Sequence, residues 1–336
     1  MTETVLVTGG TGFIARWCIV ELLQRGYRVR TTVRNASREA AVRGAISRVV
    51  DPADRLTSVA ADLTGDDGWD DAVAGCEYVL HVASPLGLDG SGYLVAPARD
   101  GALRVLRAAT AAGVTRVVLT SAANTASPSS YRDEGISDET LWTDPDAPGL
   151  QAYRRSKTLA ERAAWEFMET TNGPTTLTTI LPGAVFGPIL GSENLGSVQV
   201  IGRMLRGRMP GTPRIGLEVV DVRDITDVHI RAMTAPEAAG QRFLATGEFV
   251  WMADIAAVLR ERLGRAAAKV PTRTIPDVIV RLVALFDPEM RAITPGLGRK
   301  NRHTTAKAQQ LLGWRPRPAA DTVTDCARSL IENDAA

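Results

Sequence analysis

Apolar residues in the first 120 positions follow two alternating patterns. Short β-branched runs are each followed by a turn, and then by a segment in which apolar residues recur at helical spacing. The predicted strands cover residues 4–8, 27–33, 55–60, 77–83 and 115–120, and the predicted helices cover 13–25, 36–48, 68–74 and 97–112. Because this alternation places helices on both faces of a parallel sheet, we predict an α/β fold with a doubly wound parallel sheet.

The pattern changes after the fifth predicted strand. A polar stretch over 127–149 is rich in Asp, Ser and Pro and predicts a long surface loop. A long helix over 151–171 and a strand over 175–181 follow, after which the alternation breaks down. The later predicted helices are 198–205, 224–234, 252–264, 276–286, 304–312 and 320–332. We therefore predict a sheet domain over 1–182 and a smaller C-terminal lobe over 183–336, some segments of which return to the first domain.

The composition restricts the classes of partner that we expect for this chain. Lys and Arg total 39 against 38 Asp and Glu, so no net charge favours nucleic acid or an anionic membrane. The apolar run over 278–286 contains Arg281 and is far shorter than the ~20 residues that a membrane span needs. With no export signal at the N-terminus, we expect a cytoplasmic protein. Cys18, Cys76 and Cys326 are far apart and predicted to be buried, and we expect no metal site.

A glycine-rich turn follows the first predicted strand. The segment over 8–15 reads T-G-G-T-G-F-I-A and runs into a helical pattern, which is the context that a dinucleotide-binding turn requires. Gly9 permits a tight turn, Gly12 lets the backbone approach a pyrophosphate, and Ala15 lets the helix pack closely against the strand. Backbone N–H groups at the helix start would bind the anion. The sequence therefore predicts a Rossmann-type site that includes Gly9, Thr11, Gly12, Phe13 and Ile14.

The end of the second predicted strand distinguishes two cofactors. An acidic residue there binds the ribose 2′-hydroxyl of NAD, whereas an arginine accommodates the 2′-phosphate of NADP. The residues over 31–35 are T-T-V-R-N, with no acid, and Arg38 follows. Because Arg34 and Arg38 can form charge-assisted hydrogen bonds with a phosphate, we predict NADP(H).

Two further segments end predicted strands at the same edge of the sheet, where ligands bind. Asp62 follows the third strand and is expected near the adenine, and H-V-A-S-P over 81–85 ends the fourth. The predicted cofactor contacts in these segments are Asp62, Leu63, Val82, Ala83 and Ser84. We assign no catalytic part to His81, for which a place in the core is equally compatible with the sequence.

Tyr153 and Lys157 lie four residues apart near the start of the long predicted helix, so their side chains project from one face. A phenol has an unperturbed pKa near 10, and a nearby ammonium that stabilises the phenolate would let Tyr153 exchange a proton nearer neutral pH. After a fifth strand and a dinucleotide turn, this spacing predicts an acid–base pair.

Together these motifs resemble the extended short-chain dehydrogenases of the NAD-dependent epimerase/dehydratase superfamily. The relevant segments are T-G-x-x-G-F-I-A, H-V-A-S-P, V-L-T-S over 118–121, Y-x-x-S-K-x-L-A-E over 153–161 and P-G-A-V-F-G-P over 182–188. The nearest subgroup comprises dihydroflavonol, cinnamoyl-CoA and methylglyoxal or aldehyde reductases. The resemblance implies hydride transfer from NADPH to an aldehyde or ketone, with Tyr153 as acid, Lys157 as its modulator and a serine that polarises the carbonyl. It adds Thr120, Pro182, Gly183, Val185, Tyr153 and Lys157 to the expected cofactor contacts.

The sequence departs from the subgroup at that serine. The subgroup has T-S-S after the fifth strand and uses the second serine, where this chain has Ala122. We assign the role to Ser121, with Thr120 or Asn124 as alternatives. A site without any such donor would suit a non-catalytic NADP-binding regulator.

The C-terminal lobe is expected to bind a small, hydrophobic carbonyl compound. The apolar candidates are Val185, Phe186, Ile189, Val198, Ile201 and Leu205, joined by Trp142 and Leu150 from the polar stretch. A nucleotide-sugar epimerase or dehydratase is the alternative enzyme, and its diphosphate would need the arginines at 203, 206, 208 and 214. Asp224 is expected to cap a helix, and the chain is expected to be a monomer or a homodimer.

Overall fold

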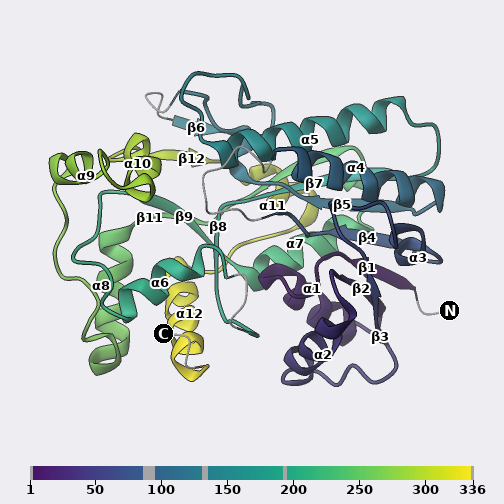
Figure 1. Ribbon diagram of the computed structural model, residues 1–336, viewed down its shortest axis with the longest axis horizontal. Helices are drawn as coiled ribbons and strands as arrows, with labels where there is room; N and C mark the ends of the chain where they lie inside the picture. The colour runs from purple at the N-terminus through teal and green to yellow at the C-terminus, as the bar shows by residue number, and fades with distance from the viewer. Residues whose placement is uncertain (1–2, 86–94, 131–134, 192–194, 334–336) are drawn as a thin grey trace.

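The computed structural model describes residues 3–85, 95–130, 135–191 and 195–333, and its centre is a seven-stranded sheet in the order β10-β7-β5-β4-β1-β2-β3 (Figure 1). The strands are β1 (Thr4–Val7), β2 (Arg28–Val33), β3 (Leu56–Ala60), β4 (Tyr78–His81), β5 (Arg116–Thr120), β7 (Thr176–Pro182) and β10 (Gln241–Ala245). All of their pairings are parallel. The predicted doubly wound α/β sheet is confirmed.

Helices cover both faces of this sheet, because the central strands are apolar on both sides. One face packs against α1 (Phe13–Gln24), α2 (Glu39–Ser47) and α7 (Val222–Thr234). The other face packs against α3 (Trp69–Val73), α4 (Val95–Ala111) and α5 (Ala152–Thr170). Figure 1 shows α4 and α5 above the sheet and α1 and α7 below it.

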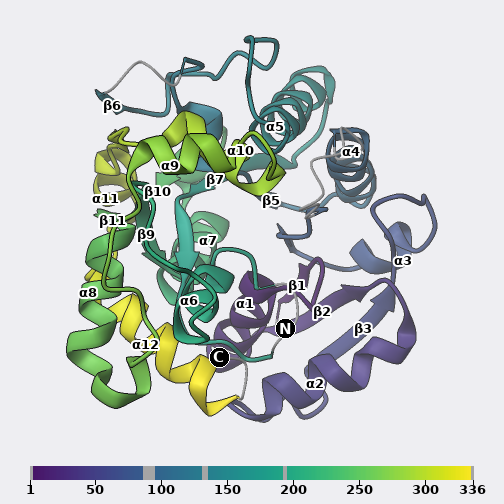
Figure 2. The ribbon, with the colours of Figure 1, turned by 60° about the vertical axis from the view of Figure 1, so that its left-hand side comes forward.

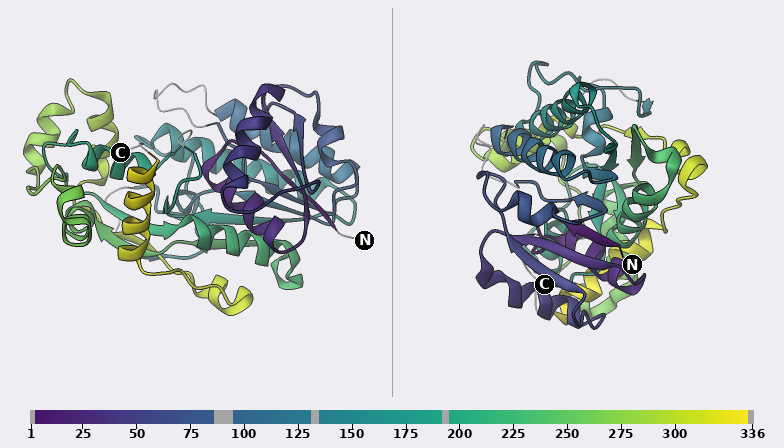
Figure 3. Two further views of the ribbon diagram at one scale, coloured as in Figure 1. Left: turned by 90° about the horizontal axis from the view of Figure 1, so that it is seen from below. Right: turned by 90° about the vertical axis from the view of Figure 1, so that its right-hand side faces the viewer.

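A smaller sheet, in the order β11-β9-β8, lies beside the large one. Its strands are β8 (Ala184–Phe186), β9 (Gly216–Asp221) and β11 (Glu248–Trp251), and it shares a core with α6 (Val198–Leu205), α8 (Met252–Leu263) and α12 (Ala319–Glu332). Figure 2 shows these three helices grouped together, away from β2 and β3. Seen from below in Figure 3, the purple N-terminal strands and the green segment around α8 lie at opposite ends of the molecule.

The remaining elements connect these parts. The short strands β6 (Gly135–Ser137) and β12 (Asn301–His303) form a parallel pair. The helices α9 (Asp277–Val283) and α10 (Pro288–Ile293) precede β12, and α11 (Ala306–Leu312) follows it.

The stretch over 127–149 is largely the surface loop that its composition predicts, but it is anchored to the interior at several points. Residues 131–134 lie outside the described part of the chain, but β6 pairs with β12, and Thr143 is fully buried. The guanidinium of Arg242 donates a hydrogen bond to the carbonyl of Glu139 (2.6 Å). Asp138, Asp144 and Asp146 are exposed, as expected for a surface loop, whereas the buried Thr143 donates its hydroxyl to the backbone.

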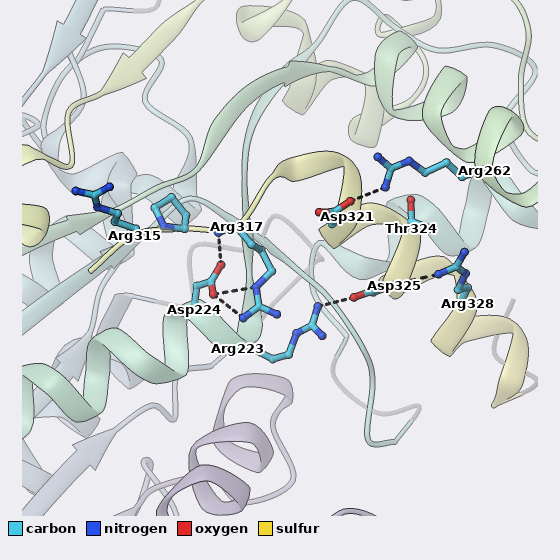
Figure 4. Close-up of a pocket in the computed structure, with 10 residues that line it drawn as sticks. Arg223, Asp224, Arg262, Arg315, Arg317, Asp321, Thr324, Asp325 and Arg328 are labelled. Carbon is cyan, nitrogen blue, oxygen red and sulfur yellow. Dashed lines mark hydrogen bonds and ion pairs between the residues drawn. The ribbon is translucent and has the colours of Figure 1, made fainter. Parts of the chain in front are cut away.

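Asp224 does not cap α7 as predicted. The cap is Asp221, whose carboxylate accepts a hydrogen bond from the backbone N–H of Arg223 (2.8 Å), so the helix begins two residues earlier than its predicted start at 224. Asp224 lies in the first turn and pairs with the guanidinium of Arg317 (2.8 Å). Figure 4 shows this pair in an arginine-lined hollow, where it connects α7 to the segment before α12.

The three cysteines are buried free thiols, as predicted. Burial raises the pKa of Cys18 and of Cys326 to about 12, so neither forms a reactive thiolate near neutral pH. Within the described residues, no helix is long and apolar enough to span a membrane.

Candidate active site

A cavity of about 900 Å³ lies at the carboxyl ends of the central strands, against the smaller sheet. The order of the strands reverses at this point, which is where open α/β sheets bind ligands. The sequence-predicted residues that line the cavity are Gly9, Thr11, Gly12, Phe13, Ile14, Arg34, Asp62, Leu63, Val82, Ala83, Ser84, Thr120, Ser121, Tyr153, Lys157, Pro182, Gly183 and Val185. Arg38 is not among the described residues that line it, because it lies farther along, at the start of α2.

The glycine turn forms one part of the cavity wall. Gly9 has a φ of +72°, and a Cβ atom there would lie 2.9 Å from the Cβ of Ala83, so this position requires glycine. Gly12 caps α1, and its N–H donates to the Gly9 carbonyl (2.8 Å). The first N–H groups of a helix have no partner within it, so they are available to an anion. Ala15 is fully buried against the sheet, and the turn fits a diphosphate.

Arg34 and Asp62 follow neighbouring strands and line the same cavity. Arg34 is exposed. Asp62 accepts hydrogen bonds from the N–H (2.8 Å) and hydroxyl (2.7 Å) of Thr64. These hydrogen bonds and the positive charge of Arg34 lower the pKa of Asp62 below its usual value, so the carboxylate is ionised at neutral pH.

Tyr153 and Lys157 lie on one face of the first turns of α5. The Tyr153 side chain is 37% exposed, whereas Lys157 is 8% exposed. Burial lowers the pKa of Lys157 to about 8, and its Nζ donates a hydrogen bond to the carbonyl of Thr120 (3.3 Å).

The pKa of Tyr153 is raised instead of lowered. The protein excludes water from much of the phenol, and this desolvation disfavours the phenolate. The ammonium of Lys157 is directed at a backbone carbonyl. Tyr153 is therefore a protonated phenol at neutral pH, in the form that donates a proton.

The hydroxyl of Ser121 points to a buried carboxylate. It donates a hydrogen bond to Glu161 (2.6 Å), which is 1% exposed and also accepts hydrogen bonds from Thr125 (2.5 Å) and Thr179 (2.8 Å). Arg242 pairs with the same carboxylate (2.9 Å). Because the one hydroxyl proton of Ser121 is bound to Glu161, this geometry does not support its predicted role as a donor to a carbonyl.

The hydroxyl of Thr120 is also bound to a side chain of the protein. The Nδ1 of His229 lies 2.7 Å from the carbonyl of Ile225, so Nδ1 carries the proton of the neutral ring. Nε2 is then an acceptor, and the Thr120 hydroxyl donates to it (2.7 Å). Of the three residues considered for carbonyl polarisation, Asn124 remains, and it lines the cavity.

The cavity also contains polar residues that the sequence does not single out. They include Ser127, Gln151, Glu218, Arg299, Asn301 and His303. Glu218 lies in β9 and His303 in β12, so segments 85 residues apart meet here. No local motif marks them, because these residues come from segments that are far apart in the sequence and meet only in the fold.

The apolar residues proposed to face a substrate are mostly core. Val185 lines the cavity, but Phe186, Ile189, Val198, Ile201 and Leu205 are buried under the smaller sheet. The ring of Trp142 lies against the guanidinium of Arg242 (3.5 Å to the ring centroid), and neither Trp142 nor Leu150 is among the described lining residues. The apolar walls instead include Leu195, Ile215, Leu217 and Phe249.

The sequence profile of the NAD dependent epimerase/dehydratase family matches residues 5–245. The chain belongs to this family. The matched region of this family member contains the glycine turn, Tyr153, Lys157 and all seven strands of the large sheet apart from the first residue of β1. Within the family, it belongs to the extended short-chain dehydrogenases of the dihydroflavonol reductase-like group.

Several family members of known name are similar in sequence. Cinnamoyl-CoA reductase 1 of Petunia hybrida is 36% identical over 260 residues, which cover 76% of each chain. Dihydroflavonol 4-reductase of Zea mays is 33% identical over 270 residues, 77% of this chain and 74% of that one. Ketoreductase azaE of Aspergillus niger is 30% identical over 354 aligned positions, 99% of this chain and 98% of that one.

Solved structures show the same fold. The yeast methylglyoxal/isovaleraldehyde reductase Gre2, solved with NADPH, superposes with a TM-score of 0.81 at 24% identity and covers 99% of this chain and 100% of its own. Vestitone reductase from alfalfa superposes with a TM-score of 0.75 at 24% identity, over 100% of both chains.

Proposed function

We propose that this chain reduces an aldehyde or ketone to an alcohol with NADPH, with Tyr153 as the proton donor. As a member of a nicotinamide-dependent reductase group, it is an oxidoreductase. The observation that carries the proposal is that Tyr153 and Lys157 line the same cavity as the glycine turn and Arg34. A cofactor bound along that wall and a carbonyl compound beside Tyr153 would share one enclosed space.

The residues present fit NADPH. The turn from Gly9 to Phe13 accommodates the diphosphate with backbone N–H groups, and Arg34 binds the 2′-phosphate. The predicted second arginine, Arg38, does not line the cavity in the described part of the chain, so we assign the 2′-phosphate to Arg34 alone. Asp62, after β3, lies beside Arg34 in the part of the cavity assigned to the adenosine.

When bound, NADPH supplies the hydride. Tyr153 then gives its phenolic proton to the carbonyl oxygen, which becomes the alcohol. The raised pKa of Tyr153 suits this direction, because the phenol keeps its proton until negative charge develops on the oxygen. Lys157 supplies an ammonium that stabilises the phenolate left behind.

Asn124 polarises the carbonyl in this chain. The subgroup uses a serine for this, at the position where this chain has Ala122. The amide of Asn124 can donate a hydrogen bond to the carbonyl oxygen, whereas the hydroxyls of Thr120 and Ser121 are bound elsewhere. We assign residues 1–182 to cofactor binding and catalysis. Residues 183–336 supply most of the substrate walls, apart from β10, which completes the large sheet.

Two other functions are less well supported. A nucleotide-sugar enzyme needs cations for a diphosphate, but Arg203, Arg206, Arg208 and Arg214 are not among the described residues that line the cavity. Arg214 pairs with Asp277 (2.5 Å) outside it. A non-catalytic regulator would not need Tyr153 and Lys157 to lie together in the cofactor cavity.

The test is NADPH consumption with a panel of aromatic and aliphatic aldehydes and ketones and, separately, product analysis with UDP- and dTDP-sugars, because epimerases and dehydratases consume no cofactor overall. We expect turnover with carbonyl compounds and none with nucleotide sugars. Turnover of the sugars alone would replace the proposal with an epimerase or dehydratase. Tight NADPH binding without turnover of any compound would favour a regulator.

A further inference from the structure

Three polar side chains that the proposed reduction does not use meet in the cavity wall. Ser127 follows the 3₁₀ turn at 123–126, Glu218 lies in β9 and His303 lies in β12. The hydroxyl oxygen of Ser127 is 2.9 Å from Nε2 of His303, and Nδ1 of His303 is 2.5 Å from the carboxylate of Glu218. We call these three residues the Ser127 triad.

The proton positions follow from the partners. A ring nitrogen that faces a carboxylate must carry a proton, so Nδ1 of His303 donates to Glu218. In the neutral ring, Nε2 is then an acceptor for the Ser127 hydroxyl, whose other nearby acceptor is the carbonyl of Ala123 (3.0 Å). Hydroxyl, imidazole and carboxylate are linked in the order that activates a serine nucleophile in hydrolases.

The triad is held in place by its surroundings. Glu218 also accepts the backbone N–H of His303 (2.7 Å), and the side chains of His303 and Glu218 are only 5% and 10% exposed. The carbonyl of Ser127 accepts hydrogen bonds from Thr143 (2.6 Å) and Arg154 (3.3 Å). Such fixed positions are what a nucleophile and its base require.

The neighbouring residues supply the other parts of an acyl-transfer site. Asn124 lies in the 3₁₀ turn, three residues before Ser127. Both line the cavity, so the Asn124 amide can donate to the oxyanion that forms when a hydroxyl attacks a carbonyl. Leu217 and Phe249 give this cavity an apolar wall for an acyl chain.

We propose that the Ser127 triad gives this chain a second activity, the hydrolysis of carboxylic esters and acyl thioesters with apolar acyl groups. The Ser127 oxygen attacks the acyl carbon while its proton passes to Nε2 of His303. The bond to the alcohol or thiol leaving group breaks, and the leaving group takes that proton. Water then attacks the acyl-serine by the same route, which releases the carboxylic acid and restores Ser127. No oxidation or reduction occurs.

The test uses p-nitrophenyl butyrate and diisopropyl fluorophosphate with the full chain in the absence of NADPH. We expect Ser127→Ala to lower hydrolysis at least about 100-fold, while Ser129→Ala, a matched change on the same segment, leaves it unchanged. Glu218→Gln should also lower it, because an amide does not stabilise the imidazolium. The fluorophosphate should add one mass label, located on Ser127, and thermal melting checks that each variant folds.

Hydrolysis that survives Ser127→Ala in a folded protein would overturn the proposal, as would a label on another residue. The outcome is independent of the reductase assignment. Tyr153→Phe should abolish reduction and keep ester hydrolysis, so each activity can fail without the other.

Discussion

At the scale of single residues, the motif and the structure point to different roles for Ser121. The subgroup pattern assigns a catalytic serine to this segment, and Ser121 is the only serine left there, yet its hydroxyl binds Glu161. Glu161 is buried and needs its donors, because a carboxylate removed from water is stable only when it is paired and hydrogen-bonded. We therefore expect Ser121 to act in stability.

Ser121→Ala should destabilise the fold by about 1–3 kcal/mol, since Glu161 loses one hydrogen-bond donor. Urea denaturation measures this loss, and kcat for a carbonyl substrate at low temperature should stay close to the wild-type value. A sharp fall in kcat with unchanged stability would restore the catalytic role. Ala122→Ser restores the serine of the subgroup, but it should change kcat little, because Asn124 already donates the hydrogen bond to the carbonyl.

Arg34→Ala should weaken NADPH binding about tenfold or more, because a charged hydrogen bond to the 2′-phosphate contributes about 1.5–3 kcal/mol. NADH affinity should change little. Fluorescence titration with both cofactors gives the comparison, and Arg38→Ala is the matched control, expected to have a smaller effect on either cofactor. An equal loss of NADPH and NADH affinity in Arg34→Ala would mean that Arg34 acts on the fold.

At the scale of elements, α5 connects the chemistry to the core. Tyr153, Lys157 and Glu161 follow one another at four-residue spacing on one face, so the first two reach the cavity and the third anchors the helix to Arg242. The same packing buries Lys157, and this burial lowers its pKa to about 8.

The rate of reduction should therefore fall as the pH rises through about 8. Above that pH, Lys157 loses the ammonium that stabilises the phenolate of Tyr153. A pH profile of kcat/KM measures this, and Lys157→Arg, which keeps its charge, should move the decline to higher pH. If Lys157→Arg showed the same decline at the same pH, the decline would come from the titration of another group.

Elements with local signals could be predicted, and elements set by distant pairing could not. The glycine turn and the long α5 are marked by nearby glycines and by helical spacing. β8, β9, β10 and β11 were not predicted, because the regular alternation of strand and helix patterns that marks the first five strands breaks down after residue 182. Ser127 and His303 are 176 residues apart, so no sequence window contains their contact.

At the scale of the whole molecule, two buried histidines make the stability of the fold depend on pH. His81 hydrogen-bonds Thr8 (2.9 Å) and His229 hydrogen-bonds Thr120 (2.7 Å). Burial lowers the pKa of His81 to about 3 and that of His229 to about 4. Both are therefore neutral in the folded protein, and His81 belongs to the core.

Stability should fall as the pH drops below about 6.5, because the unfolded chain then binds protons that the folded chain excludes. For two histidines, the free energy of unfolding should fall by about 2–4 kcal/mol between pH 7 and pH 5. Urea unfolding at the two pH values measures it, and His229→Gln should reduce the difference by removing one of the two groups. Equal stability at pH 5 and pH 7 would contradict the conclusion that both histidines are buried in their neutral form.

The central claim is that Tyr153 donates the proton in a carbonyl reduction, and the most direct measurement is NADPH oxidation by wild-type protein and Tyr153→Phe side by side. The substrate is any carbonyl compound that the wild type reduces. Phenylalanine keeps the ring but lacks the hydroxyl, so NADPH should still bind while the rate falls by about 100-fold or more. A Tyr153→Phe protein that retained near-native activity would contradict the account.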